Sequence, residues 1–177
     1  TSVALADGTV FTMIGSGGGN TGELWDGTSQ WSLLGGMNFD DPILNYTHGE
    51  RNWWPLLNLM PDGRIFHSGP TPDMHIIDTA GIGSVTQIGP QINGWYPKHG
   101  TTVMYDEGML LSAGGWVDGG NTASTNQSMV IDLNGAAPAV RTIAPMIYPR
   151  KFQNGVTLPT GEVLVIGGNT SGAVSYT

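Results

Sequence analysis

The sequence has no cysteine and few charged residues, and both absences exclude classes of protein. Without cysteine, the 177 residues form neither a disulfide framework nor a thiolate metal site. Charged residues make up only 11% of the chain, far below the usual share of about a quarter. The six basic residues, against 14 acidic ones, form no run longer than Arg150-Lys151. Because nucleic-acid binding needs a basic stripe that displaces counterions, we expect no nucleic-acid partner.

Long apolar runs are missing as well. No stretch approaches the roughly 20 apolar residues that cross a bilayer, so we expect no membrane span. Glycine, in contrast, is abundant at 28 of 177 residues, roughly twice its usual share. Abundant glycine with low charge and scattered Val, Ile, Thr and Trp favours an all-β protein with many tight turns. No segment with helical periodicity competes with this interpretation.

Four segments share one pattern: an apolar strand, a tight turn with glycine, a second apolar strand and then small residues. They span residues 3–11, 57–66, 103–111 and 156–165, with turn glycines Gly8, Gly63, Gly108 and Gly161. Successive turn glycines are 45 to 55 residues apart. Each turn has the Asp/Thr-Gly or similar chemistry of a hairpin, in which glycine accepts a positive φ. A single copy is a generic β-turn, whereas four copies predict a repeat architecture.

A second hairpin follows each of the first three copies, at residues 23–33, 74–88 and 129–143. Two hairpins per period make a four-stranded blade, and a period near 50 is typical of kelch repeats. We therefore predict a kelch-type β-propeller of about three and a half four-stranded blades, a partial propeller over 1–177. The predicted blades are approximately 1–50, 51–94, 95–147 and an incomplete 148–177.

The incomplete fourth copy leaves two arrangements open. A repeat array exposes apolar faces and strand edges wherever it is cut. Either the chain closes a four-bladed ring in which its two ends share a blade, or it forms part of a larger propeller. The expected partner is therefore the remainder of the propeller or another copy of the chain.

Three of these blades also carry flanking residues that go beyond a generic kelch repeat. In the first of these blades they are Arg51-Asn52-Trp53-Trp54-Pro55 with 59–66. In the next they are Trp95-Tyr96-Pro97 with 102–106 and 112–115, and in the last Ala144-Pro145-Met146 with 149–151 and 158–168. In this order they resemble the middle blades of the galactose oxidase and glyoxal oxidase family of copper radical oxidases. The likeness runs along nearly the whole chain.

The resemblance implies a secreted protein with a seven-bladed ring that oxidises primary alcohols or aldehydes with O2 and releases H2O2. Three glycosylation acceptor triplets, at Asn45, Asn126 and Asn169, fit an extracellular or cell-surface location. In the family two tyrosines and two histidines hold copper, and the resemblance places these residues before Thr1 and after Thr177. Within the chain we therefore predict no catalytic residue, no metal ligand and no cofactor, and we expect the 177 residues alone to be inactive.

Two positions depart from the family pattern. Gln153 stands where galactose oxidases have a histidine, and no tryptophan occurs near Gly17 and Gly18, where one often stacks on the radical tyrosine. These departures keep an alternative open, a non-catalytic kelch propeller that serves as a carbohydrate- or protein-binding or structural module.

Propellers bind ligands at the mouth of the channel, with residues just before the inner strand of each blade. Here those residues are Arg51, Trp53, Trp54, Trp95, Tyr96, Lys98, His99, Arg150, Lys151, Phe152 and Gln153. Aromatic rings stack on sugar faces and arginine forks a carboxylate, which predicts a carbohydrate or a small alcohol or aldehyde as ligand. The alternative is that these side chains pack between blades.

The remaining titratable residues indicate no further chemistry. The four histidines, His48, His67, His75 and His99, show no metal-ligand spacing. We expect His67 and His75 to be surface or hydrogen-bonded structural residues, and His48 and His99 to precede inner strands. Carboxylates such as Asp40, Asp41, Asp62, Asp78, Asp106 and Asp132 fall at turns, where we expect them to cap backbone amides.

Overall fold

The computed structural model describes residues 1–13, 21–37, 55–70, 73–90, 95, 97–116 and 123–170. Within these ranges the chain forms fourteen strands and no helix, which confirms the all-β prediction. No helix long and apolar enough to cross a membrane occurs in the described part. The chain divides into two compact units, Thr1–Pro90 and Gln91–Thr177.

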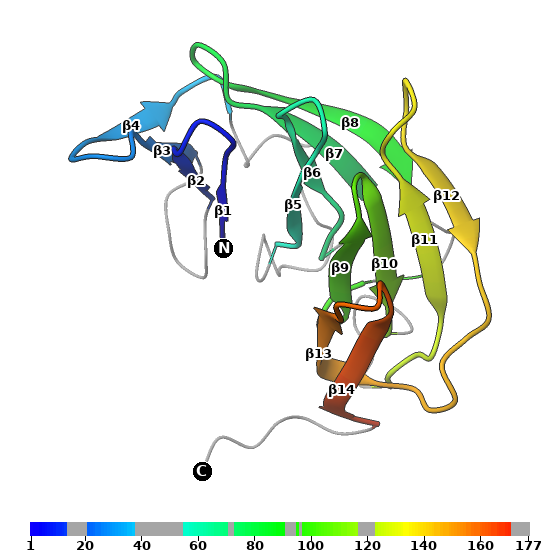
Figure 1. Cartoon of the computed structure of the whole chain (residues 1–177). Helices are drawn as coiled ribbons and strands as arrows, with labels where there is room; N and C mark the ends of the chain where they lie inside the picture. Colours follow the sequence, from blue (N-terminus) through cyan, green and yellow to red (C-terminus); the bar gives the residue numbers. More distant parts are fainter. Residues whose placement is uncertain are drawn as a thin grey trace. The chain divides into compact units, whose positions relative to one another are not determined.

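The first unit contains two four-stranded antiparallel sheets, each a simple meander in which neighbours in sequence pair in space (Figure 1). The first sheet consists of β1 (Ser2–Ala4), β2 (Val10–Thr12), β3 (Gly22–Trp25) and β4 (Trp31–Leu34). The second consists of β5 (Leu57–Leu59), β6 (Ile65–His67), β7 (Asp73–Asp78) and β8 (Ser84–Pro90).

The second unit contains one four-stranded meander and one two-stranded sheet (Figure 1). The meander consists of β9 (Thr101–Asp106), β10 (Met109–Ala113), β11 (Ser128–Asp132) and β12 (Ala139–Thr142). The two-stranded sheet pairs β13 (Lys151–Thr157) with β14 (Val163–Asn169). All seven hairpins expected from the repeat are therefore confirmed.

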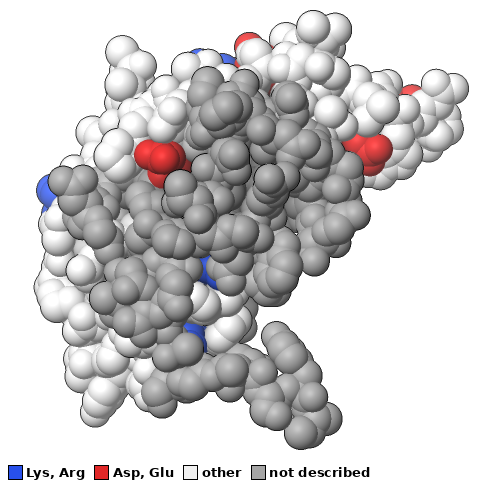
Figure 2. Space-filling view, turned by 180° about the vertical axis from the view of Figure 1, so that it is seen from behind, with Lys and Arg blue, Asp and Glu red and all other residues white. Residues whose placement is uncertain are grey.

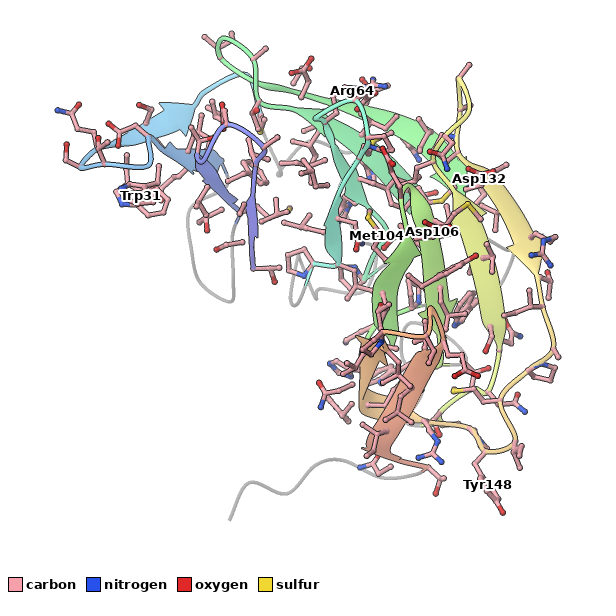
Figure 3. The ribbon with its side chains drawn as sticks, viewed as in Figure 1. Trp31, Arg64, Met104, Asp106, Asp132 and Tyr148 are labelled. Atoms are coloured by element: carbon pink, nitrogen blue, oxygen red, sulfur yellow. The ribbon has the colours of Figure 1, made fainter. Side chains whose placement is uncertain are left out.

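The turns that close the first hairpin of each copy contain glycine for a backbone reason. Gly8, Gly63, Gly108 and Gly161 have φ of 88°, 87°, 65° and 82°, a region that side chains with a Cβ rarely adopt. Carboxylates brace the turns, as expected. Asp62, Asp78, Asp106 and Asp132 each accept a bond from a backbone N–H one or two residues further on, and Asp106 and Asp132 are labelled at hairpin ends in Figure 3.

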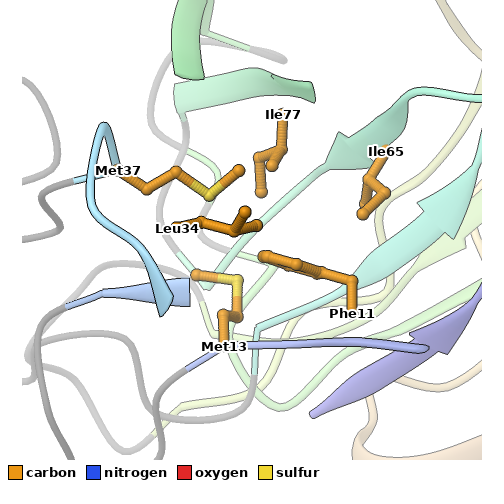
Figure 4. Packing of buried hydrophobic residues seen from close by; sticks show 6 residues of the cluster. All are labelled: Phe11, Met13, Leu34, Met37, Ile65 and Ile77. Carbon is orange, nitrogen blue, oxygen red and sulfur yellow. The ribbon is translucent and has the colours of Figure 1, made fainter. Parts of the chain in front are cut away.

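The core of the first unit lies between its two sheets (Figure 4). Phe11 is fully buried and packs with Leu34 of the first sheet, with Met37 just after β4, and with Ile65 and Ile77 of the second sheet. The packing is close at Gly22, where no side chain fits. A Cβ added there would collide with the ring of Phe11 and would lie 3.0 Å from the sulfur of Met37. The outermost strand β4, in contrast, exposes Trp31 (Figure 3).

In the second unit, β13 packs against β9. The hydroxyl of Thr157 donates to the carbonyl of Met104 at 2.9 Å. A Cβ added at Gly155 would collide with Val103 and would lie 3.0 Å from the hydroxyl oxygen of Thr101. Glycine at this position therefore lets the two sheets approach closely. The same approach brings together the segments that lead into the two strands.

Candidate functional site

The residues before β9 and at the start of β13 have an unusual backbone. His99 and Phe152 are the non-glycine residues with positive φ in the described part, at 60° and 59°. The amide of Phe152 donates to the carbonyl of His99 at 2.7 Å, which ties the two segments together. Because a left-handed conformation costs a side chain with a Cβ about 1–2 kcal/mol, the surrounding packing holds both residues in place.

Three aromatic rings meet at this junction. The imidazole of His99 stacks on Phe152, with ring centroids 4.2 Å apart and planes 27° apart. Trp116, which follows β10, meets His99 edge-on at 5.2 Å. All three residues are partly exposed. The rings therefore form a small aromatic surface that reaches solvent, of the kind that stacks on a sugar face or a flat ligand.

Two lysines lie against the same rings. The Nζ of Lys98 is 4.2 Å from the centroid of the Trp116 ring, and the Nζ of Lys151 is 5.4 Å from it and 6.0 Å from that of Phe152. These distances are in the range of cation–π attraction. Lys98 is 4% exposed and Lys151 only 1%, and lysine is almost never fully buried unless it is paired. We call Lys98, His99, Trp116, Lys151 and Phe152 the lysine–aromatic cluster.

Burial sets the protonation of this cluster. It lowers the pKa of both lysines, because a charged amine is poorly solvated away from water. Burial, and next the positive charges of Lys98 and Lys151, lower the pKa of His99 from 6.5 to about 4. At neutral pH the imidazole is therefore uncharged. On the face seen in Figure 2, lysine and arginine appear only as small separate areas.

The other predicted ligand-binding residues that the structure describes bond to the backbone. The indole N–H of Trp95 donates to the carbonyl of Gly114 at 3.0 Å, and the Nε2 of Gln153 donates to that of Ala113 at 2.8 Å. Both side chains are buried. Burial agrees with the alternative given for these residues in the sequence analysis, that they pack between blades. The guanidinium of Arg150 donates to the carbonyl of Gly167 at 2.7 Å. Their role in binding stays a prediction.

Four other predicted residues lie outside the described ranges: Arg51, Trp53, Trp54 and Tyr96. Asp40, Asp41 and His48 lie outside them too. Trp116 was not among the predicted site residues. The sequence feature that could have pointed to Trp116 is its position directly after Gly114-Gly115, the pair of glycines that ends the third inner hairpin.

Within the described ranges, no group of three or more His, Cys, Asp or Glu side chains is placed to hold a metal ion. His67 and His75 are close, but their Nδ1 atoms are 3.2 Å apart and share a hydrogen bond across β6 and β7. Both are buried. They are hydrogen-bonded structural residues, which is one of the two environments expected from the sequence.

The comparisons with known proteins gave matches among solved structures alone. No protein-family profile and no curated protein matches the chain. A fungal alcohol oxidase of the AA5 family, solved in complex with copper, is 28% identical with a TM-score of 0.87. The match covers 98% of this chain and 37% of the oxidase chain. YjhT matches with a TM-score of 0.67 at 11% identity, over 95% of this chain and 58% of YjhT, and so shares the fold alone.

The fold and this match define an all-β protein of the propeller type. The chain is related in structure to the galactose oxidase-like copper oxidases, which confirms the resemblance seen in the sequence. It spans less than two fifths of the length of the matched oxidase.

Proposed function

We propose that this chain is a segment of a secreted galactose oxidase- or glyoxal oxidase-like protein that oxidises primary alcohols or aldehydes with O2 and produces H2O2. The observation that carries the proposal is the match to the copper alcohol oxidase over 98% of the chain at a TM-score of 0.87. The shared 28% identity supports a common ancestry rather than a common fold alone.

In this proposal the four sheets are consecutive kelch blades of one propeller, part of a seven-bladed ring whose remainder is the partner of the chain. Copper would be held by residues outside the 177 residues, where the resemblance places the two tyrosines and two histidines of the family. The chain would contribute the scaffold and one wall of the ligand site. That wall is the partly exposed aromatic surface of His99, Trp116 and Phe152.

The test is an H2O2 assay on the full-length protein that contains this segment. After copper loading, primary alcohols, galactose and small aldehydes should each be offered as substrate, and a chelated sample serves as the control. Copper-dependent H2O2 release supports the proposal. Its absence with every substrate, in protein shown to bind copper, contradicts it. For the 177-residue chain alone we expect neither copper uptake nor turnover.

A second candidate function is a propeller that has lost the metal and binds a ligand without turning it over. Gln153 favours it, because this residue stands where galactose oxidases have a histidine and is committed to the carbonyl of Ala113. Its ligand would be a carbohydrate held on the aromatic surface. Any copper-dependent turnover excludes this alternative, whereas sugar binding without turnover supports it.

Variants of the aromatic surface distinguish binding from a purely structural role. Phe152→Ala in the full-length protein should raise KM or the Kd for a sugar, because it removes a ring that stacks on the ligand. Trp31→Ala is the matched control, since Trp31 is an exposed ring in the other unit. Equal effects of the two variants would argue against a ligand-binding surface.

A further inference from the structure

The two lysines of the lysine–aromatic cluster are the only lysines in the chain. The other four basic residues are arginines. Lysine is ordinarily a surface residue with a hydrated ammonium group. Here both copies are buried, in segments 53 residues apart in sequence, and both contact one tryptophan. A lysine that served only solubility or surface charge would be exposed. The burial of both lysines at one point therefore calls for another explanation.

From this arrangement we propose that Lys98 and Lys151 form a carbonyl-reactive amine site, at which a small aldehyde condenses with a lysine to give an imine. The uncharged amine is the nucleophile in such chemistry, and desolvation favours the uncharged form. Burial lowers the pKa of both amines, in agreement with this role.

The reaction balances without an oxidant or reductant. The lone pair of the amine nitrogen forms a bond to the carbonyl carbon, and the oxygen takes a proton to give a carbinolamine. The C–O bond then breaks, and the oxygen leaves as water with both protons of the amine. The product is a C=N bond, and hydrolysis reverses the step.

The neighbouring side chains suit a carbonyl compound. The indole N–H of Trp116 is a buried donor with no hydrogen-bond partner among the described residues. A carbonyl oxygen would satisfy it, and an unsatisfied buried donor is costly. The rings of Trp116, His99 and Phe152 are partly exposed while the amines are buried. In this proposal a small aldehyde approaches the amines from the side on which the rings are exposed.

Aldehydes are the products of alcohol oxidation, so the choice of ligand class rests on the proposed function. The reactivity of the two amines does not rest on it. Imine formation is measured on the lysines themselves and the oxidase reaction through H2O2, so either idea can fail while the other holds.

The experiment is reductive trapping with propanal and cyanoborohydride at pH 7, followed by peptide mass mapping. Arg141→Lys supplies the matched control, because residue 141 is exposed on β12 and the variant gives an ordinary lysine in the same molecule. The uncharged fraction of an amine rises about tenfold for each unit by which its pKa falls. We expect Lys98 or Lys151 to be alkylated about threefold faster than the control lysine, or more, and this advantage to disappear well above the ordinary lysine pKa of about 10.4, where both amines are uncharged.

Two outcomes would overturn the proposal. Either neither Lys98 nor Lys151 is labelled, or neither is labelled faster than the control lysine at pH 7. Trp116→Phe tests the indole donor, and it should slow trapping while the thermal unfolding midpoint shows that the variant is folded. If trapping is unchanged in that folded variant, the indole N–H takes no part in the reaction and the assigned geometry is wrong.

Discussion

The Nδ1 atoms of His67 and His75 lie 3.2 Å apart, directly opposite each other on β6 and β7. One ring must donate to the other, so the pair requires at least one uncharged imidazole. Both rings are buried. Burial, and next the charge that His75 can carry, lower the pKa of His67 from 6.5 to about 3.

This pair should make the first unit sensitive to acid. Between about pH 6.5 and 3 the unfolded chain binds a proton at His67 that the folded chain does not. Stability therefore falls as the pH drops through this window. Urea unfolding at pH 7.5, 6 and 4.5 should show a declining free energy of unfolding. The double variant His67→Leu/His75→Leu should decline less steeply, and equal slopes would contradict the role of the pair.

Removal of one partner should cost stability even at neutral pH. In His67→Leu, the buried His75 loses its bond to Nδ1, and a lost bond of this kind costs roughly 1–3 kcal/mol. Urea unfolding at pH 7.5 measures it. The double variant at the same pH should lose less than the two single variants together, because it leaves no imidazole without its partner.

The titration of His99 should report on the two buried lysines. We expect an NMR titration to give a pKa near 4. Lys98→Met removes a nearby positive charge and should raise that pKa, though not to 6.5, because burial is the larger cause. Arg141→Met, which removes an exposed positive charge, is the control and should leave the titration unchanged. A normal pKa in the unaltered protein would contradict the buried environment.

Two glycines of the second unit should respond differently to alanine. Both Gly114 and Gly161 have positive φ, so each Gly→Ala change costs about 1–2 kcal/mol from the backbone. At Gly114 the new Cβ would also clash with Gln153 and lie 2.6 Å from the carbonyl oxygen of Arg150, which adds roughly 1–3 kcal/mol. At Gly161 nothing lies within 4 Å. Thermal unfolding should rank Gly114→Ala as the less stable; the reverse order would contradict the close approach.

The core between the first two sheets should be far less tolerant than the outer strand. Phe11 is fully buried, so Phe11→Ala should cost about 3–5 kcal/mol of unfolding free energy. Leu33→Ala on β4 is the matched control, because Leu33 is 67% exposed, and surface changes stay within about 0.5 kcal/mol. Denaturant unfolding compares the two. A similar loss in both variants would mean that Phe11 is not a core residue.

The sequence by itself determined the strands and turns of this protein. Alternating apolar residues and a turn glycine define each hairpin through local backbone chemistry, so Gly8, Gly63 and Gly161 marked their hairpins without knowledge of the fold. The flanking motifs also predicted the relation to the copper oxidases, which the structural match confirmed. Because the same residue pattern recurs in each repeat, a signal that is weak in one copy becomes strong in four.

The tertiary structure decided what the side chains do at the ends of those strands. Lys98 and Lys151 are 53 positions apart, and only the packing of β13 on β9 brings both to Trp116. Nothing in the order of residues shows that a lysine is buried, since burial depends on which distant segments cover it. For the same reason the sequence did not show that His67 and His75 bond to each other, although both lie in predicted strands. Local propensity acts within a few residues, whereas burial and pKa depend on the whole fold.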